Sequence, residues 1–298
     1  MYNTLNFGFA CNFSAVCSVL YYGEWENRIF TRRFRHKTGR AAIDIYQEWG
    51  ETLSFIEVTN LRKVYRLGQE RVYALKKIDL TIERGEICCI LGTSGSGKST
   101  LLNMLAGLEK PTRGSIVING TDITKLSERK LAKFRQENTG FVFQSYNLLP
   151  QLTSIENVGM PLMFKGYRRK VRDKEARAML KAVGLESRAK HRPNQMSGGQ
   201  QQRVGIARAF VAKPNVVFAD EPTGNLDTKT TADVMALMVR MCRKHGLTLI
   251  LVTHDPDTAR YADRIVHLID GEIHSDEINH DVYDPDAPQK AEEPEPVS

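Results

Sequence analysis

The chain has 298 residues, of which 41% are hydrophobic and 26% charged, and its formal net charge is +7. This balance is ordinary for a soluble globular protein with a real core. Its longest apolar stretches, 7–22 and 247–252, are short or interrupted by polar residues, so neither reaches the roughly 20 apolar residues that span a bilayer. The first also lacks the basic start of a secretory signal. We therefore expect a chain that neither crosses a membrane by itself nor is secreted.

Charge and cysteine content further restrict the class of protein and its cellular compartment. The positive charge suits polyphosphate ligands and an anionic membrane face, while a solvated charged surface explains it equally well. Five cysteines are an odd number, and none of them stands in a paired metal-type spacing. We expect reduced thiols in a cytosol.

Three parts of the sequence differ in composition. Residues 1–53 hold both tryptophans and a basic, aromatic run without a sustained period, so we predict a poorly ordered N-terminal extension. The alternatives are a segment that binds anionic lipid or RNA, and one that is not translated. Residues 54–275 have the regular pattern of a folded domain. Residues 276–298 carry eight acidic residues and one lysine, so we predict an acidic disordered tail.

Apolar runs alternate with helical periods inside the central part. In chain order, strands are expected at 55–61, 73–82, 87–91, 114–120, 140–143, 215–219, 247–253 and 264–269. Helices are expected at 99–107, 127–136, 173–183, 200–212, 228–245 and 256–261, with another beginning at 153. The alternation predicts an α/β fold with a mainly parallel sheet covered on both faces. The helix-rich stretch at about 145–195 predicts an inserted helical subdomain.

One glycine-rich stretch stands between an expected strand and an expected helix. It reads Gly92, Thr93, Ser94, Gly95, Ser96, Gly97, Lys98, Ser99 and Thr100. Side chains at Gly95 and Gly97 would fill the space that an anion needs, so glycine lets backbone N–H groups face a phosphate. Lys98 would reach the β- and γ-phosphates, and Ser99 would take one position on Mg²⁺. The stretch predicts a nucleoside triphosphate site.

Three further polar positions follow expected strands. Asp220 ends a buried strand and is expected to hold Mg²⁺, while Glu221 is expected to accept a proton from the attacking water. Gln144 could orient that water or coordinate Mg²⁺. His254 could hydrogen-bond the γ-phosphate, and a structural histidine explains its position equally well.

A second glycine-opened helix start occurs at Ser197, Gly198, Gly199 and Gln200. Its unpaired N–H groups make another anion site. Because one triphosphate hardly needs two such cradles from a single chain, we predict a dimer in which each nucleotide lies between the two copies.

Taken together, these motifs resemble the ATP-binding subunits of ABC transporters. The resemblance covers about 54–273, with all motifs in the family's order. Gly92–Thr100 resembles the Walker A motif, Gln144 the Q-loop, 196–200 the signature, 216–221 the Walker B motif, 224–227 the D-loop and His254 the switch histidine. Met196 departs from the usual leucine of the signature, with little consequence expected.

The family implies a P-loop NTPase fold with an antiparallel β subdomain beside the parallel core. It also implies ATP and Mg²⁺ as cofactors, stacking of adenine on Tyr65, and a nucleotide-sandwich dimer that includes Asp227 of the D-loop. Separate integral-membrane permease subunits would dock in a groove near 144–164, which places the protein peripherally on the cytoplasmic face of the cell membrane. No nucleic acid is expected as a partner.

Within the family, the sequences around Ser197–Arg203 and Pro222–Asp227 resemble the branch of macrolide exporters, lipoprotein-release complexes and antimicrobial-peptide efflux systems. This favours export or extraction of a hydrophobic compound, peptide or lipoprotein. The alternative is a regulatory ATPase of the cell-division type, which signals through a permease-like partner. An ATPase that acts on nucleic acid or ribosomes is disfavoured, because such proteins usually carry two cassettes or long coiled-coil inserts.

Overall fold

A computed structural model describes residues 54–285 of the chain. The predictions for residues 1–53, and for the acidic tail from residue 286 onward, lie outside the described residues.

A sheet of ten strands runs through the described part of the chain in the order β5-β4-β1-β2-β10-β9-β3-β8-β7-β6. Its antiparallel portion consists of β1 (Ile56–Leu67), β2 (Glu70–Ile82), β4 (Arg113–Ile118) and β5 (Thr121–Asp122). Its parallel portion consists of β3 (Ile87–Leu91), β6 (Thr139–Phe143), β7 (Val216–Asp220), β8 (Thr248–Thr253) and β9 (Arg264–Ile269). The predicted α/β class, with a mainly parallel core and an antiparallel β subdomain, is confirmed.

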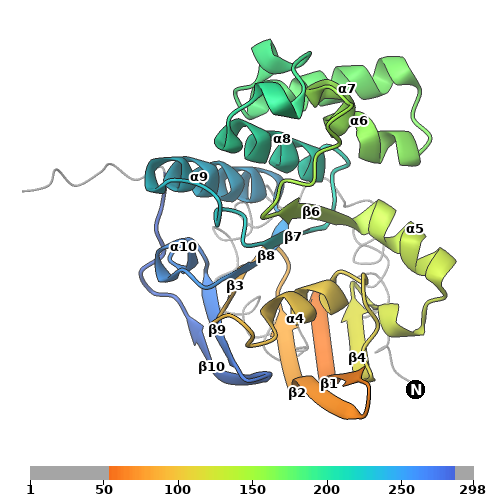
Figure 1. The fold of residues 1–298 in the computed structure, drawn as a ribbon, viewed down its shortest axis with the longest axis vertical. Helices are drawn as coiled ribbons and strands as arrows, with labels where there is room; N and C mark the ends of the chain where they lie inside the picture. Colours follow the sequence, from red (N-terminus) through yellow and green to blue (C-terminus); the bar gives the residue numbers. More distant parts are fainter. Residues whose placement is uncertain (1–53, 286–298) are drawn as a thin grey trace, which may run out of the picture. The chain divides into compact units, whose positions relative to one another are not determined.

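Some helices flank this sheet, and others form a separate group beyond its β6 edge (Figure 1). The helices are α4 (Lys98–Leu105), α5 (Glu128–Asn138), α6 (Ser154–Phe164), α7 (Arg169–Ala182), α8 (Gly198–Phe210), α9 (Thr228–His245) and α10 (Pro256–Ala259). Short 3₁₀ turns occur at Ile123–Lys125, Glu186–Arg188 and Pro193–Gln195. Helices α6, α7 and α8 pack on one another, and the first two lie in the stretch at about 145–195 for which a helical subdomain is predicted.

Local sequence explains why the central elements form where they do. Strand β8 is buried at every position, and β3 at all but its last, which is the pattern of parallel strands covered on both faces. Helix α9 begins where the Asp227 side chain accepts a hydrogen bond from the Thr230 amide, and it ends at Gly246 in a left-handed conformation.

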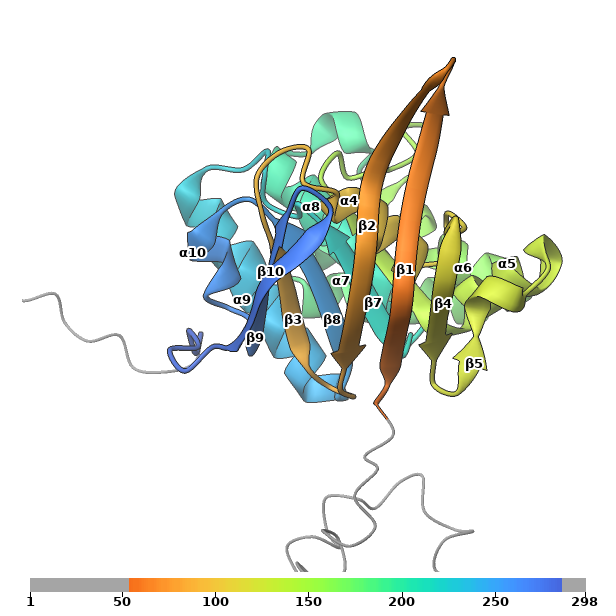
Figure 2. The ribbon, with the colours of Figure 1, turned by 90° about the horizontal axis from the view of Figure 1, so that it is seen from below.

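The antiparallel hairpin of β1 and β2 is longer than the sequence predicts, and it extends past the neighbouring strands (Figure 2). Its outer residues are mostly polar, so they lack the apolar alternation that marks a half-buried strand. The hairpin matters for the site because its β2 strand lies beside α4.

A further strand was not expected from the sequence. Strand β10 (Glu272–Ile278) pairs antiparallel with β9 and extends to 278, past the boundary expected at 275. Its residues are mainly polar, which hides it from hydrophobic periodicity. The guanidinium of Arg264 on β9 donates to Asp276 Oδ2 of β10 at 2.6 Å and to the Thr81 carbonyl of β2 at 2.8 Å.

Within the described residues, no helix combines the length and apolar character needed to cross a membrane.

We predict that Arg264→Ala lowers the free energy of unfolding by about 2 kcal/mol, because it leaves a partly buried carboxylate and a carbonyl without their donor. Arg260→Ala is the control, since the long 4.0 Å contact of Arg260 with Asp281 is exposed and should contribute less than about 0.5 kcal/mol. Urea unfolding curves of the two variants provide the measurement. If both variants lost the same free energy of unfolding, Arg264 would not be the residue that anchors β10.

Candidate nucleotide site

The glycine-rich loop joins β3 to α4, as the sequence predicts. Gly97 stands before α4 with φ of 101°, and a Cβ there would lie 2.5 Å from the Ala74 carbonyl oxygen. Gly95 has φ of 82°, while a Cβ there would meet nothing within 4 Å. The loop thus needs glycine for its backbone conformation and for the close approach of β2. The reason expected from the sequence is different, namely that glycine leaves room for an anion.

Helix α4 begins without a side-chain cap, so no side chain occupies its first N–H groups in the way a capping serine would. Lys98 is only 6% exposed, and its Nζ donates to the Thr93 carbonyl at 2.8 Å. The Ser96 hydroxyl is buried without a hydrogen-bond partner. An uncapped helix start, a buried ammonium and an unpartnered hydroxyl together fit the phosphates of a nucleotide.

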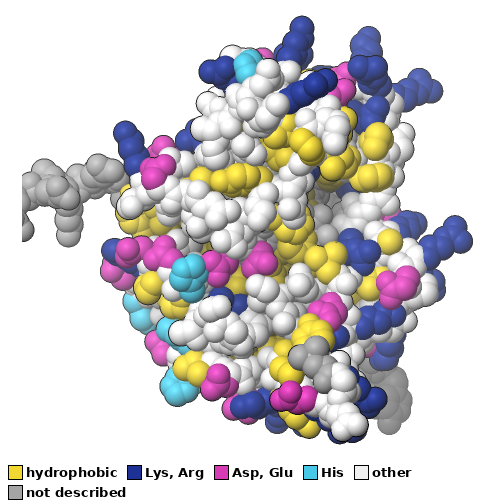
Figure 3. All heavy atoms as spheres, viewed as in Figure 1, with side chains coloured by type: hydrophobic (Ala, Val, Ile, Leu, Met, Phe, Trp, Pro, Cys, Tyr) yellow, Lys and Arg dark blue, Asp and Glu magenta, His cyan; other side chains and the backbone are white. Residues whose placement is uncertain are grey.

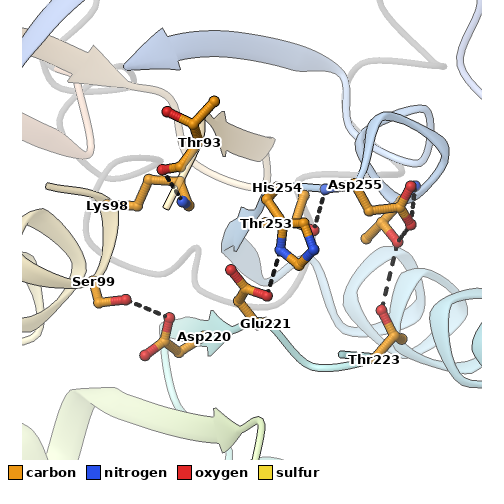
Figure 4. Close-up of polar contacts among 10 residues, drawn as sticks. Thr93, Lys98, Ser99, Asp220, Glu221, Thr223, Thr253, His254 and Asp255 are labelled. Carbon is orange, nitrogen blue, oxygen red and sulfur yellow. Dashed lines mark hydrogen bonds and ion pairs between the residues drawn. The ribbon is translucent and has the colours of Figure 1, made fainter. Parts of the chain in front are cut away.

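Ser99 and Asp220 come from distant parts of the chain and meet beside this loop (Figure 4). The Ser99 hydroxyl donates to Asp220 Oδ1 at 3.0 Å. Burial raises the pKa of Asp220, and Glu221 raises it further, whereas the Ser99 hydrogen bond and the Lys98 charge lower it. A hydroxyl and a carboxylate are oxygen ligands of the kind that Mg²⁺ prefers. The donor set fits that ion.

The next residue, Glu221, points to His254. His254 Nδ1 lies 2.7 Å from Glu221 Oε2, although the two residues are 33 positions apart in the sequence. The Glu221 side chain is 18% exposed and that of His254 60%. Glu221 has φ of 44°, a left-handed conformation that is uncommon for a residue with a side chain. The imidazole therefore fixes the direction of the carboxylate that the sequence nominates as a base.

A cleft of about 630 Å³ brings six of the predicted residues together. Its lining includes Gly92, Thr93, Ser94, Gln144, Glu221 and His254. It also includes Pro256, His267 and Ile269, which sequence reasoning missed. The pairing of β9 with β3 sets His267 opposite Leu91 and so brings His267 and Ile269 here, and no motif in the sequence indicates that pairing.

Gln144 lies against the D-loop. A Cβ on Gly224 would lie 2.7 Å from Gln144 Nε2, and the Asn225 side chain donates to the Gln144 carbonyl at 3.1 Å. A side chain at 224 would therefore displace the end of the Gln144 side chain. The Asp227 side chain caps α9 through the Thr230 amide at 3.0 Å and does not line the cleft.

Tyr65 lies on β1 and is half-buried. Its hydroxyl donates to Glu109 Oε2 at 2.8 Å. Burial and this hydrogen bond raise the pKa of Tyr65, whereas Thr100, the last residue of the phosphate loop, acts to lower it. Tyr65 is therefore next to the loop, although it is not in the lining of the cleft. Glu109 was not expected from the sequence.

The second glycine cradle lies elsewhere in the same chain. Ser197 caps α8 by accepting from the Gln200 amide, and the Gln200 side chain accepts from the Ser197 amide at 3.2 Å. Figure 1 shows α8 with the helical subdomain and α4 beside the antiparallel strands, on different sides of β6 and β7. The chain does not bring Ser197–Gln200 to its own phosphate loop.

One buried contact ties α8 to the segment after β7. The Gln202 side chain is 0% exposed, and its Nε2 donates to the carbonyl of Pro222, the residue next to Glu221. Its Oε1 is buried without a partner. The signature helix and the residue predicted to act as base are therefore held together within the chain.

Comparisons with known proteins agree with this geometry. The family model described as ABC transporter matches residues 75–224. The chain is 47% identical over 223 residues to the lipoprotein-releasing system ATP-binding protein LolD of Geobacter metallireducens, covering 75% of this chain and 99% of that protein. It is 45% identical over 223 residues to the macrolide export ATP-binding/permease protein MacB of Rhodopirellula baltica, covering 74% of this chain and 33% of that protein.

A solved structure is also similar. It is the dimeric structure of a post-hydrolysis state of the ATP-binding cassette MJ0796 of Methanocaldococcus jannaschii, bound to ADP and Pi. The TM-score is 0.70 at 45% sequence identity, over 75% of this chain and 98% of that one.

The site defines a P-loop nucleotide triphosphatase. Together with these likenesses, it shows that the chain belongs to the ABC transporter family, as one of its ATP-binding proteins. The predicted family and the predicted ATPase activity are confirmed. The roles of individual residues stay predictions.

We predict that Lys98→Ala weakens binding of ATP about tenfold or more, because it removes the buried cation beside the phosphate loop. Lys130→Ala, which removes an exposed lysine on α5, should leave the affinity unchanged. Titration with a fluorescent ATP analogue measures both. Unaltered affinity in the Lys98 variant would remove this lysine from the site.

Proposed function

We propose that this ATPase powers a separate membrane permease for the export or extraction of a hydrophobic compound, a peptide or a lipoprotein. The observation that carries this proposal is the likeness to LolD and MacB, at 47% and 45% identity over most of the ATPase domain. On this proposal the protein works at the cytoplasmic face of the cell membrane, as a peripheral subunit held by its permease.

We infer that two copies share each nucleotide. The phosphate loop of one copy would hold the phosphates from one side, and Ser197–Gln200 of the other copy would close on them from the opposite side. Two observations support this arrangement: α8 and α4 lie apart within one chain (Figure 1), and a relative at 45% identity forms a dimer in its ADP-bound structure. Asp227 would lie in the contact between the copies.

The residues in the cleft and beside it can then divide the chemistry among themselves. Lys98 binds the phosphates, Ser99 and Asp220 would hold Mg²⁺, and adenine would stack on Tyr65. When bound, Mg²⁺ supplies charge that neutralises the phosphate oxygens. Glu221 accepts the proton of the attacking water, at an orientation set by His254. His254 itself, or Gln144, would sense the γ-phosphate or orient the water.

A groove of about 820 Å³ between α5, β6, α6 and α8 suits the permease. Its apolar lining includes Phe141, Phe143, Met160, Pro161 and Phe164. Four cations, Arg129, Lys133, Arg135 and Arg208, line it as well, and no acidic side chain does. Hydrophobic side chains with Lys and Arg around them are visible on this side of the molecule (Figure 3).

Side-chain exposure shows which residues of the docking region expected near 144–164 face outward. Phe164 is 65% exposed and Met163 48%, whereas Leu162 is 4% exposed and belongs to the core. Exposed aromatic and thioether groups are typical of sites that bind an amphipathic helix. The cations make a helix with acidic residues on its flanks the best partner.

The catalytic part of the proposal predicts that Glu221→Gln abolishes turnover. Loss of the base should lower the rate of ATP hydrolysis about 100-fold or more, while ATP binding is kept and the dimer accumulates. Single-turnover hydrolysis and size-exclusion chromatography with Mg-ATP measure the two effects. Glu186→Gln, at an exposed acid on the helical subdomain, is the control. Hydrolysis at the normal rate in the Glu221 variant would exclude this residue as the base.

The docking part of the proposal predicts that Phe164→Asp breaks the link to the permease. The substitution places a like-charged, polar group where an apolar, acid-flanked helix would bind, so co-purification with the membrane subunit should be lost while hydrolysis by the isolated protein continues. Val171→Asp, at an exposed apolar residue of α7 outside the groove, should keep the complex. Persistence of the complex in the Phe164 variant would contradict docking in this groove. The membrane protein recovered with the control also separates a transporter from a regulatory complex of the cell-division type.

A further inference from the structure

Tyr65 is held by a small polar cluster that the predicted mechanism does not use. Its hydroxyl donates to Glu109 Oε2 at 2.8 Å. The other carboxylate oxygen of Glu109 lies 2.8 Å from Lys63 Nζ. The same ammonium lies over the Tyr65 ring, 5.1 Å from its centroid. The three side chains therefore close a ring of contacts around one aromatic platform.

This cluster is partly withdrawn from water. The side chain of Lys63 is 13% exposed and that of Glu109 30%, and Lys63 Nζ also donates to the Lys110 carbonyl at 2.8 Å. Burial alone would raise the pKa of Glu109, but hydrogen bonds from Lys63 and Tyr65 outweigh it and lower that pKa. Burial and the Glu109 hydrogen bond raise the pKa of Tyr65. Glu109 is thus a carboxylate, and Tyr65 a neutral donor, at physiological pH.

Glu109 is also tied to the helix that carries the phosphate loop. Its backbone amide donates to the Asn103 carbonyl at 3.2 Å, and that of Leu108 donates to the same carbonyl at 2.8 Å. Asn103 belongs to α4, whose first residue is Lys98. A short path of hydrogen bonds therefore connects the ring of Tyr65 on β1 to the helix whose start binds phosphate.

We propose that Glu109, with Lys63, is a positioning residue that fixes the Tyr65 ring at a set distance and tilt from the phosphate loop, so that base and phosphates are bound together. Lys63 covers one face of the ring, so the base stacks on the other face. The inference rests on the proposed function in one respect, the role of Tyr65 as the surface for adenine. Glu109 acts through Tyr65 and does not touch the nucleotide.

The experiment compares two ligands, ATP and inorganic tripolyphosphate, which has the phosphates but no base. Binding of each with Mg²⁺ is measured by calorimetry for the unmodified protein and for Tyr65→Ala, Tyr65→Phe, Glu109→Ala and Glu109→Gln. Base stacking on an aromatic side chain typically changes affinity by about five- to a hundredfold. We expect Glu109→Ala to weaken ATP binding about tenfold and to leave tripolyphosphate binding unchanged.

Two further comparisons separate positioning from general damage. Glu109→Gln keeps an acceptor for the Tyr65 hydroxyl and should recover part of the lost affinity. The pair Tyr65→Phe and Glu109→Ala should lose no more affinity together than the larger single loss, because both break the same hydrogen bond. Glu128→Ala is the matched control, since this exposed acid pairs with the neighbouring Lys110 at 3.0 Å and should change neither affinity.

The outcomes distinguish this inference from the function on which it rests. If Tyr65→Ala binds ATP normally, Tyr65 is not the base platform and that part of the proposed function is wrong. If Tyr65→Ala weakens ATP alone while Glu109→Ala binds normally, only the positioning role is overturned. Equal losses for ATP and tripolyphosphate in Glu109→Ala, or a fall in its thermal unfolding midpoint that matches the loss, would also overturn it.

Discussion

The parallel register of three buried strands is the constraint on which the site depends. Strand β3 pairs with β8 so that Leu91 lies opposite Thr253, and β8 pairs with β7 so that Val252 lies opposite Asp220. All three strands therefore end at one edge of the sheet. The residues that follow them, at 92, 221 and 254, line a single cleft. A shift of one strand by a residue would turn its side chains to the other face and separate the group.

Those parts of the fold and the site that depend on local patterns could be predicted from the sequence. Buried apolar strands and the phosphate loop are recognised from local sequence patterns. Acids that end such strands can be assigned to the same edge of the sheet. Polar strand β10 could not be predicted, because its residues lack an apolar period and the contacts that hold it, pairing with β9 and the bond from Arg264, form only in the folded chain. Glu109 and His267 could not be predicted either, since their neighbours are brought close only by tertiary pairing. At Gly97 the sequence predicts the need for glycine, but for another reason. It indicates room for an anion, whereas in the structure the carbonyl of Ala74 leaves no space for a Cβ.

Contacts within the chain connect the proposed hydrolysis site with the proposed docking groove. Gln202 on α8 bonds the carbonyl of Pro222, beside the predicted base. The Arg208 guanidinium, on the same helix, donates to the Tyr146 carbonyl at 2.8 Å, just after Gln144. Arg208 also lines the apolar groove. A helix that binds both segments offers a physical route between partner and nucleotide, because neither segment can shift without changing one of these hydrogen bonds.

The close approach of Ala74 to Gly97 has one more consequence. A carbonyl oxygen lies so near the start of α4 that the loop has no room to shift toward β2, so a tilt of the antiparallel strands toward the loop would displace it. The two ends of a bound nucleotide would consequently travel together when the enzyme opens and closes. Its hinges must then be sought toward the helical subdomain, on the side of the molecule that the hairpin does not brace.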